Sequence, residues 1–553
     1  MKERTKKVVY PLLIVLFLFF TGTTFQGNDD VYDRINKNLD VFGKVYKNVI
    51  LEYVDEIDTD RFMKAGIEGM LSTLDPYTKF YDEENIEELD LITTGRYGGV
   101  GVTIGLRDST VKIIDVMKGY EAEKKGLRVG DEILEVDGID AKNMKLEKIR
   151  NIVRGEAGTV LILKVKRDEE EISFNLTRQE IILKNISYFG FLKGEYSNVA
   201  YIKLDRFTQS SVNEFENTLK NFKSNKELKG LIIDLRGNGG GLLDAAIGIL
   251  NLIIDKNNLL LITKGKELSN EKKYFSKGDP LIPVNIPLAV LIDKSTASAS
   301  EILAGAVQDL DRGIIIGSTS FGKGLVQQIR DINNESKMKI TIQRYYTPSG
   351  RWIQEKNYFK ENKFGVFMNA EAYSQKEFKT MNGRIVYANG GITPDVEIDI
   401  EPKSEICKYF INKDVFFKFS NYYVSQNPGI KIFKSTDGTL GLFKQFIEAY
   451  QYDYISAADK KITELRQIAA DKKYSADFGN NLNLLEYEIR LEKEKEFYAS
   501  ENEILKEIEH EINKRILSEK EQIENSLDYD DVVLETLKIL LNDVEYKRIL
   551  NIY

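Results

Sequence analysis

Histidine and cysteine are almost absent from this chain of 553 residues, which contains one of each, His510 and Cys407. A single cysteine excludes an internal disulfide framework. His510 lies in a charged helical stretch, far in sequence from the serine-rich and glycine-rich segments described below, and we expect it to be solvated at the surface. A hydrolase built on this sequence would therefore lack both a Ser-His-Asp triad and a Cys-His pair, and lysine is the best remaining base for a serine nucleophile.

Charge and ligand patterns exclude further classes of protein. The formal net charge is −9, and no basic patch is interleaved with aromatic residues, so nucleic acid is not an expected partner. No cluster of His, Cys or Asp has the spacing of metal ligands, so the sequence predicts neither a metal nor a cofactor. The length corresponds to three or four domains of about 150 residues each.

The N-terminus has the pattern of an export signal. Four basic residues within the first seven positions precede an unbroken apolar run at 8–20, and small residues follow. The run is shorter than the roughly 20 apolar residues of a transmembrane helix. No small-x-small cleavage site follows it, so residues 1–27 are interpreted as either a cleaved signal peptide or an uncleaved signal anchor. We expect an exported protein, periplasmic or anchored in the inner membrane through this segment.

Apolar spacing predicts the elements that follow. Residues 28–37 are polar and are predicted to be a tether. Over 38–94, apolar residues recur at four-residue spacing, as on a helix, until Pro76 breaks the pattern. Region 182–402 alternates short apolar runs with helical segments, which is typical of a buried parallel sheet with its connecting helices. Region 403–553 is charged and helical, and its apolar stripes are expected to serve packing or dimerisation. The apolar runs are 199–204, 231–235, 288–292 and 314–316.

Residues 95–181 form a glycine-rich, β-patterned unit. It opens with Tyr97-Gly98-Gly99-Val100-Gly101-Val102 and continues through Gly-Leu-Arg-Val-Gly-Asp-Glu-Ile-Leu at 126–134 and Asp-Gly at 137–138. In this order the pieces resemble a PDZ domain, whose loop amides hold a peptide's terminal carboxylate while the peptide adds as a strand to a sheet edge. The resemblance implies that the opening loop binds C-termini and that Arg154, after the second helix, communicates occupancy. For the loop alone, a tight glycine bulge is the structural alternative.

A serine-rich segment follows the run that ends at residue 292. It reads Ser295-Thr296-Ala297-Ser298-Ala299-Ser300-Glu301. Ser298 and Glu301 fit a capping box at the start of a helix predicted over 300–310. A serine at a helix N-terminus also has backbone amides and the positive end of the helix dipole beside it, which favour an alkoxide or oxyanion. The spacing alone leaves both interpretations open.

Two glycine-rich segments also follow predicted strands. Asp234-Leu235-Arg236 leads into Gly237-Asn238-Gly239-Gly240-Gly241, where loop amides would face the carboxyl edge of an α/β sheet. Lys323, in Phe321-Gly322-Lys323-Gly324, is either a surface turn residue or a desolvated base. Residues 317–323 also spell most of a phosphate-binding loop, but Gly324 stands where Ser or Thr would ligate Mg²⁺, so a conventional nucleotide site is not expected.

Over about residues 40–400, these segments together resemble the carboxyl-terminal processing proteases, also called tail-specific proteases. The resemblance implies a Ser-Lys dyad in which Ser298 attacks a peptide carbonyl and Lys323, held neutral, takes its proton. Gln327, one helical turn on, would orient the lysine. A free lysine has a pKa of about 10.4, so this mechanism requires burial to lower it by several units.

The same resemblance implies an oxyanion hole and shows two departures. The amides of Gly240 and Ala299 would stabilise the oxyanion, whereas Asp309 matches an acidic position that is more structural than catalytic. The family usually has Asn-Asn-Pro-Gly-Gly where this chain has Gly-Asn-Gly-Gly-Gly at 237–241, and the extra glycines predict a looser loop. An insertion at about 355–383 is longer than the family pattern.

The sequence therefore predicts an α/β multidomain protein in which a PDZ-like β-rich domain precedes an α/β protease core. N-terminal helices and a long C-terminal helical appendage flank them. The expected function is that of a serine endopeptidase that cleaves exported proteins chosen by their C-terminal tails. The alternative is a catalytically inactive PDZ-containing binding protein for exported polypeptides. A second copy of the chain, joined through the helical regions, is a further expected partner. The predicted boundaries are 1–27, 38–94, 95–181, 182–402 and 403–553.

Overall fold

The computed structural model describes residues 29–83, 85–107, 109–167, 169–225, 227–356, 358, 376–388, 390–398 and 402–552. The predicted export signal and most of the predicted insertion at 355–383 lie outside the described residues. Among the described helices, none is long and apolar enough to cross a membrane. The chain forms two compact units, Met1–Pro76 and Tyr77–Tyr553, and each is described by itself.

The first unit contains two helices, α2 (Asp29–Glu52) and α3 (Thr59–Leu71). The tether predicted at 28–37 is wrong, because α2 already begins at Asp29. Val31, Ile35 and Leu39 continue the four-residue apolar spacing of the downstream pattern, and this spacing outweighs the polar composition of the segment.

The region predicted to resemble a PDZ domain, residues 95–181 (the PDZ region), is a β-rich part of the second unit. Its main sheet has the strand order β3-β4-β5-β7-β8, with β6 beside β5, and β2 pairs with β9 in a separate ribbon. Strand β3 is therefore an edge strand, and α6 packs beside it. The strands are β2 (Arg96–Gly99), β3 (Val102–Arg107), β4 (Thr110–Val116), β5 (Glu132–Val136), β6 (Ile139–Asp140), β7 (Val160–Arg167), β8 (Glu170–Thr177) and β9 (Gln179–Ile182); the helices are α5 (Glu121–Lys125) and α6 (Leu146–Val153).

A six-stranded sheet forms the centre of region 182–402, which the sequence predicts to be the α/β protease core. Its order is β10-β11-β12-β15-β16-β21, and all neighbours are parallel except the antiparallel pair β10 and β11. The four continuous apolar runs of the sequence form the four inner strands, from β11 to β16, because both faces of the sheet are covered. The strands are β10 (Ile186–Phe191), β11 (Val199–Leu204), β12 (Gly230–Asp234), β15 (Leu288–Ile292), β16 (Ile314–Gly317) and β21 (Val396–Glu397).

Different helices cover the two faces of this sheet. Because side chains alternate along a strand, Ile233 packs with α7 (Ser211–Asn225), α8 (Leu243–Leu250) and α9 (Ala299–Asp309). Ile232 packs on the opposite face with α17 (Asp531–Leu540) and α18 (Asp543–Ile549). The end of the predicted helical appendage thus packs as a layer on the six-stranded sheet. The predicted boundary at 402 separates segments that share one hydrophobic cluster.

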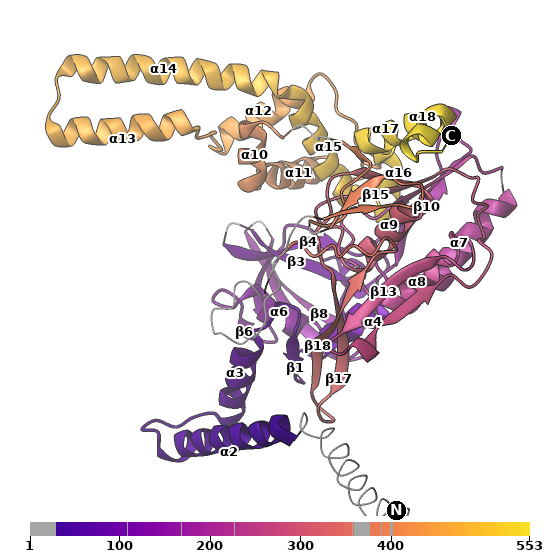
Figure 1. Cartoon of the computed structure of the whole chain (residues 1–553). Coiled ribbons are helices and arrows are strands. Elements are labelled where there is room, and N and C mark those ends of the chain that lie inside the picture. Colours follow the sequence, from indigo (N-terminus) through magenta and orange to yellow (C-terminus); the bar gives the residue numbers. More distant parts are fainter. Residues whose placement is uncertain are drawn as a thin grey trace, which may run out of the picture. The chain divides into compact units, whose positions relative to one another are not determined.

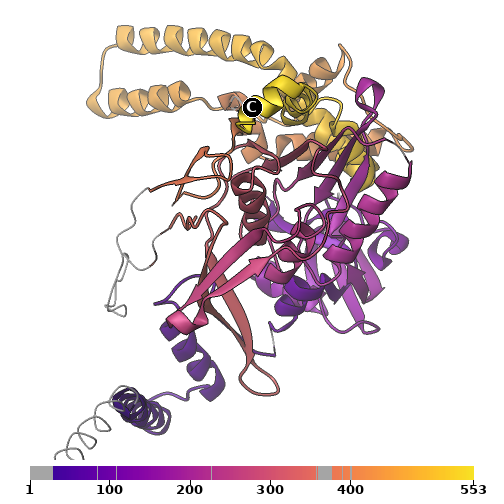
Figure 2. The same ribbon diagram turned by 45° about the vertical axis from the view of Figure 1, so that its right-hand side comes forward.

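A second sheet lies within the same unit. Its strand β18 pairs with β1, β13 and β17, and β14 pairs with β13. Strands β17 and β18 form a long hairpin, which is seen in both views (Figures 1 and 2). The strands are β1 (Lys79–Tyr81), β13 (Leu259–Gly265), β14 (Lys272–Phe275), β17 (Leu325–Asp331) and β18 (Lys337–Tyr346). The short helix α4 (Glu87–Thr94) follows β1, and a small hairpin pairs β19 (Glu377–Lys379) with β20 (Ile385–Tyr387).

The remaining C-terminal helices have a core of their own, rich in phenylalanine. Ile508 and Ile512 of the predicted stripe are fully buried there, and His510 between them is exposed, as predicted. Helices α13 and α14 run side by side as a long hairpin (Figure 1). The helices are α10 (Glu405–Asn412), α11 (Val415–Gln426), α12 (Thr439–Ala449), α13 (Ala457–Lys472), α14 (Ala476–Ala499), α15 (Glu501–Ile516) and α16 (Glu519–Ser526).

Candidate active site

Ser298 lies at the N-terminal end of α9 in a strained backbone conformation. Its φ is +57° and its ψ is −115°, a region that residues other than glycine rarely adopt. The turn leaves Ser298 half-buried, while the neighbouring Ser300 is fully buried and donates a hydrogen bond to the Asn238 carbonyl at 3.0 Å. Of these two serines, only Ser298 is placed to meet a ligand at the surface.

The Glu301 carboxylate joins the serine segment to the lysine segment. Its Oε2 accepts from the Ser298 N–H at 2.7 Å and from the Lys323 N–H at 2.9 Å. Its Oε1 accepts from the Gly322 N–H at 2.7 Å and from the Ser320 hydroxyl at 2.6 Å. Glu301 is fully buried, and burial raises its pKa to about 7 despite these four donors. The predicted capping residue therefore also organises the lysine loop.

Tyr345, on β18, joins the same two residues through their carbonyls. Its hydroxyl lies 3.2 Å from the Ser298 carbonyl oxygen and 2.5 Å from that of Lys323. Burial raises the pKa of Tyr345 well above its usual value, so the hydroxyl keeps the proton that it donates. Ser298 and Lys323 thus share an acceptor for their amides and a donor for their carbonyls.

The glycine-rich loop after β12 packs directly against the Ser298 turn. A Cβ on Gly240 would lie 2.6 Å from the Ala297 carbonyl oxygen and 2.9 Å from the Ser298 Cβ, and the φ of Gly240 is +94°. The buried side chain of Asn238 fixes the loop by donating to the Leu204 carbonyl at 2.7 Å. Close packing therefore requires glycine at 240. A Cβ at Gly237 or Gly239, the two departures from the family pattern, would meet nothing within 4 Å, so the looser loop stays a prediction.

The two predicted oxyanion donors differ in their hydrogen bonding. The Gly240 N–H donates to the Asn238 Oδ1 at 2.8 Å, so it would have to release this bond to reach a substrate. Within the described part of the chain, nothing accepts from the Ala299 N–H. The Ala299 amide is therefore the better placed of the two, and the role of Gly240 stays a prediction.

Lys323 and Gln327 lie at the base of the β17–β18 hairpin. Gln327 is on strand β17 and not one helical turn after the lysine, and its Nε2 donates to the Thr341 Oγ1 at 3.1 Å. The Lys323 Nζ lies 4.2 Å from the centroid of the Tyr77 ring. The amides of Gly322 and Lys323 point at the Glu301 carboxylate, which argues against a phosphate-binding loop here.

Asp234 and Arg236 connect the glycine-rich loop to the C-terminal helices. Arg236 donates to Asp234 at 2.6 Å and, through the same Nη2, to Asp530 at 2.7 Å. Burial alone would raise the pKa of Asp234, but Arg236 and Lys203 overcome this effect and hold it at about 2. Asp234 is therefore ionised, and its ion pair with Arg236 fixes the start of the glycine-rich loop.

The predicted carboxylate loop of the PDZ region carries two unused donors. In the described residues, the N–H groups of Val100 and Gly101 have no hydrogen-bond partner. Gly98 is held so close to Gly155 that a Cβ would lie 1.8 Å from the Gly155 carbonyl oxygen. The Arg154 guanidinium lies 4.8 Å from the centroid of the Tyr97 ring, in a cation–π contact.

The other predicted peptide-binding residues lie on either side of the Val100 and Gly101 amides. Gly99 ends strand β2, and Val102 begins the edge strand β3. Val100 itself is buried in the PDZ core, so this loop offers backbone groups to a ligand.

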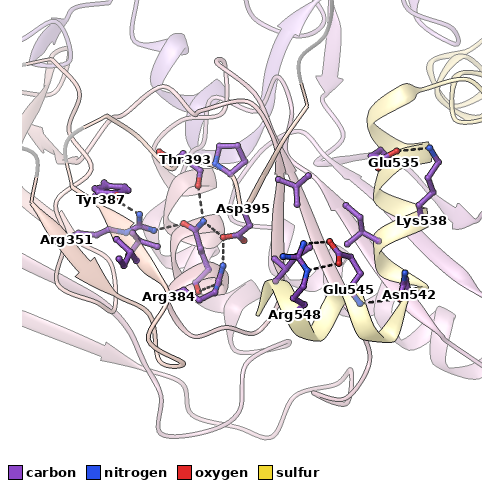
Figure 3. Close-up of a pocket in the computed structure, with 17 residues that line it drawn as sticks. Arg351, Arg384, Tyr387, Thr393, Asp395, Glu535, Lys538, Asn542, Glu545 and Arg548 are labelled. Atoms are coloured by element: carbon purple, nitrogen blue, oxygen red, sulfur yellow. Dashed lines mark hydrogen bonds and ion pairs between the residues drawn. The ribbon is translucent and has the colours of Figure 1, made fainter. Parts of the chain in front are cut away.

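A cavity of about 810 Å³ lies among α17, α18 and the segments around β20 and β21, and Figure 3 shows its lining. It contains Arg351, whose Nη2 lies 2.8 Å from the carboxylate of Asp309. Asp309 ends α9, whereas Ser298 begins it, so this cavity is at the far end of the helix. Asp309 holds the turn before Arg351 by accepting from the Ser349 N–H at 2.9 Å, a structural role.

Sequence reasoning missed Tyr345 and the second role of Glu301. The sequence contains a signal for Glu301, because a glutamate in a capping box next to a candidate nucleophile is an obvious acceptor. For Tyr345 there is no local signal, since its hydroxyl meets Ser298 and Lys323 only through the pairing of β18 with β17 and β13.

Comparisons with known proteins agree with this architecture. Family models match as follows: an activating protease CtpB N-terminal domain at 21–85, a PDZ domain at 112–167, peptidase family S41 at 198–362, and a C-terminal helical domain of a probable PDZ-protease at 406–540. A carboxy-terminal-processing protease of Bartonella bacilliformis is 32% identical over 344 residues, which cover 61% of this chain and 77% of that protein. The chain belongs to the carboxy-terminal processing protease family.

Two further comparisons give the extent of the family likeness. The carboxy-terminal processing protease CtpB of Bacillus subtilis is 33% identical over 58% of this chain, and the match spans 66% of that relative's length. A solved photosystem II D1 C-terminal processing protease is 25% identical, covers 65% of this chain and 92% of its own, and has a TM-score of 0.38. The predicted family and the predicted fold class, a PDZ domain before an α/β core with helical flanks, are confirmed.

Proposed function

We propose that this chain is a serine endopeptidase that cleaves exported polypeptides, recognised by their C-terminal tails, with a Ser298–Lys323 dyad. The observation that carries the proposal is the double connection between these two residues. Their amides donate to one carboxylate oxygen of Glu301, and the hydroxyl of Tyr345 lies beside both of their carbonyls. Ser300, the neighbouring serine of the motif, donates instead to the Asn238 carbonyl.

In the proposed reaction, neutral Lys323 takes the proton from the Ser298 Oγ as this oxygen attacks the scissile carbonyl carbon. The Ala299 amide, at the N-terminus of α9, donates to the developing oxyanion, and Gly240 adds a second donor once it leaves Asn238. The amine of the leaving peptide takes up the proton, and water then hydrolyses the acyl-enzyme. Gln327 orients the lysine from β17.

Substrate choice is proposed to depend on the PDZ region. The amides of Val100 and Gly101, which have no acceptor among the described residues, support this proposal as donors to a terminal carboxylate. The adjacent edge strand β3 offers its backbone to the rest of the tail, beside α6. Arg154, stacked on Tyr97, is a candidate to transmit occupancy of this loop. The proposed location is outside the cytoplasm, in the periplasm or anchored in the inner membrane.

Cleavage of an unstructured polypeptide tests the proposal, using the chain and its Ser298→Ala, Lys323→Ala and Ser300→Ala variants. The first two are expected to abolish cleavage and remain folded. Ser300→Ala is the matched control and should keep the activity, because its buried hydroxyl donates to the Asn238 carbonyl, away from Lys323 and Glu301. Activity in Ser298→Ala, or its loss in Ser300→Ala alone, would contradict the nucleophile assignment.

The same polypeptide with an amidated C-terminus tests the tail recognition. Charge-assisted hydrogen bonds contribute roughly 1.5–3 kcal/mol, so amidation should weaken binding at least about tenfold. Equal binding of both forms would reject recognition by the tail and leave the dyad chemistry standing. Tail binding by a chain that never cleaves would instead favour the inactive binding protein.

A further inference from the structure

A tyrosine from outside the sequence motifs covers the lysine of the proposed dyad. The centroid of the Tyr77 ring lies 4.2 Å from the Lys323 Nζ, well within the range of a cation–π contact. The ring is half-buried, and its hydroxyl lies 3.2 Å from that of Tyr358. The Tyr358 ring meets it edge-on at 5.9 Å, so a second aromatic residue fixes the orientation of Tyr77.

The segment that carries Tyr77 is anchored to the hairpin on which Gln327 lies. Thr78 is buried, and its hydroxyl accepts from the Thr341 N–H at 3.2 Å. The side chain of the same Thr341 accepts from Gln327. Strand β1 follows at once and pairs with β18, so the position of the Tyr77 ring is set by strand pairing and not by a loose loop.

We propose that Tyr77 is a positioning residue for Lys323, one whose ring face stabilises the ammonium form of the lysine during the reaction. This inference rests on the proposed function. When the proton moves from the Ser298 Oγ to the Lys323 Nζ, the lysine gains a positive charge. An aromatic face attracts an ammonium group much more strongly than an amine. The ring therefore favours the product of the proton transfer, beyond merely holding the side chain in place.

Other titratable groups also surround Lys323. Glu301 accepts from its backbone amide, Tyr345 donates to its carbonyl, and Tyr358 lies behind Tyr77. Glu355 packs beside the neighbouring Gly322. Because burial raises the pKa of Glu301 to about 7, the acid side of a pH–rate profile can report this carboxyl as well as the lysine. The test therefore needs a readout specific to Lys323.

The experiment compares the full chain with Tyr77→Leu, Tyr77→Phe and Tyr77→Trp. Acetylation of Lys323 by an amine-reactive ester, followed site by site with mass spectrometry, gives the pH at which this amine becomes half-reactive. The pH dependence of kcat/KM is measured in parallel. Tyr274→Leu is the matched control, because it removes a ring 4.4 Å from the Lys272 Nζ at the other edge of the same sheet.

Tyr77→Leu is expected to lower the half-reactive pH of Lys323 by about 0.4–1.5 units, the range of a cation–π contact. Above that pH, where the lysine is already neutral in both proteins, kcat should fall by up to about two- to thirtyfold. Tyr77→Phe keeps the ring and should retain both values. Tyr77→Trp should move the pH upward and remains informative if the leucine variant fails to fold. The control should leave Lys323 unchanged.

Two results have distinct meanings. An unmoved half-reactive pH in both Tyr77→Leu and Tyr77→Trp would overturn the inference, even if kcat falls, because the ring would then have only a structural role. If the half-reactive pH moves as expected but the unmodified chain cleaves nothing, the contact between Tyr77 and Lys323 stands and the proposed function fails.

Discussion

At the scale of single residues, Glu301 joins the serine segment to the lysine segment, and its environment predicts a dependence of stability on pH. Burial raises its pKa from 4.5 to about 7, so the folded protein binds a proton more tightly than the unfolded chain. The contribution of Glu301 to stability is therefore fully present below pH 4.5 and is lost as the pH rises through 7.

Glu301→Gln should remove this dependence, because the amide does not titrate. Between pH 4.5 and 7, the free energy of unfolding of the unmodified chain should fall by about 3 kcal/mol relative to that of the variant. Urea unfolding of both proteins at pH 5 and pH 8 measures the difference, and other groups cancel in the comparison. A difference that is the same at both pH values would show that burial does not perturb this carboxyl.

The two residues of the proposed dyad could be predicted from the sequence, but the contacts that connect them could not. Ser298 and Lys323 stand in local patterns, a capping box and a glycine-flanked turn after a strand. The contacts that join them come from Glu301 and Tyr345, which act across elements. The hydrogen bond from the Gly240 N–H to the Asn238 side chain could not be predicted from the sequence either. An asparagine two residues away can turn its amide toward any of several partners.

At the scale of elements, helix α17 is tied to the loop next to Ser298. Asp530 caps this helix by accepting from the N–H groups of Val532 and Val533, and it also pairs with Arg236. The apolar stripe of α17 was readable from the sequence as helical spacing. The sequence did not predict that this stripe packs on the second face of the six-stranded sheet, because an apolar stripe does not specify which surface covers it.

Asp530→Asn and Asp530→Ala separate the two roles of this residue. Asparagine is as good an N-cap as aspartate, so Asp530→Asn should lose only the ion pair, about 1–2 kcal/mol of the free energy of unfolding. Asp530→Ala should lose about 1 kcal/mol more. Urea unfolding at low and at high salt checks the assignment, since only the ion-pair part should diminish with salt. An asparagine variant as stable as the unmodified chain would show that the pair contributes nothing.

At the scale of the whole molecule, the PDZ region contacts the C-terminal helices as well as the protease core. Arg107, at the end of β3, lies 3.0 Å from Asp414 and beside the ring of Phe417. Arg515, on α15, stacks on the same ring and donates to Asn421, which packs against Gly130 of the PDZ region. The helical appendage thus supports the domain that is proposed to read substrate tails, a link that separate domain patterns do not reveal.

Reversing one charge should loosen this contact. Arg107→Glu places two carboxylates together, so hydrogen exchange should become faster in α11 and in the turn at 128–131. Arg96→Glu is the matched control, because Arg96 pairs with Glu180 inside the PDZ region and bridges no domains. Adding Asp414→Arg to Arg107→Glu should slow the exchange again.

The coupling between Arg107 and Asp414 should be modest, about 0.5 kcal/mol in a double-mutant cycle, because Arg107 is 36% exposed and solvent screens the pair. Exchange in α11 is the more sensitive measurement, since it reports the local opening directly. If Arg107→Glu and Arg96→Glu leave α11 equally protected, the helices do not hold the PDZ region through this pair. The support would then rest on the packing of Asn421 against Gly130, where any side chain at 130 would meet the amide.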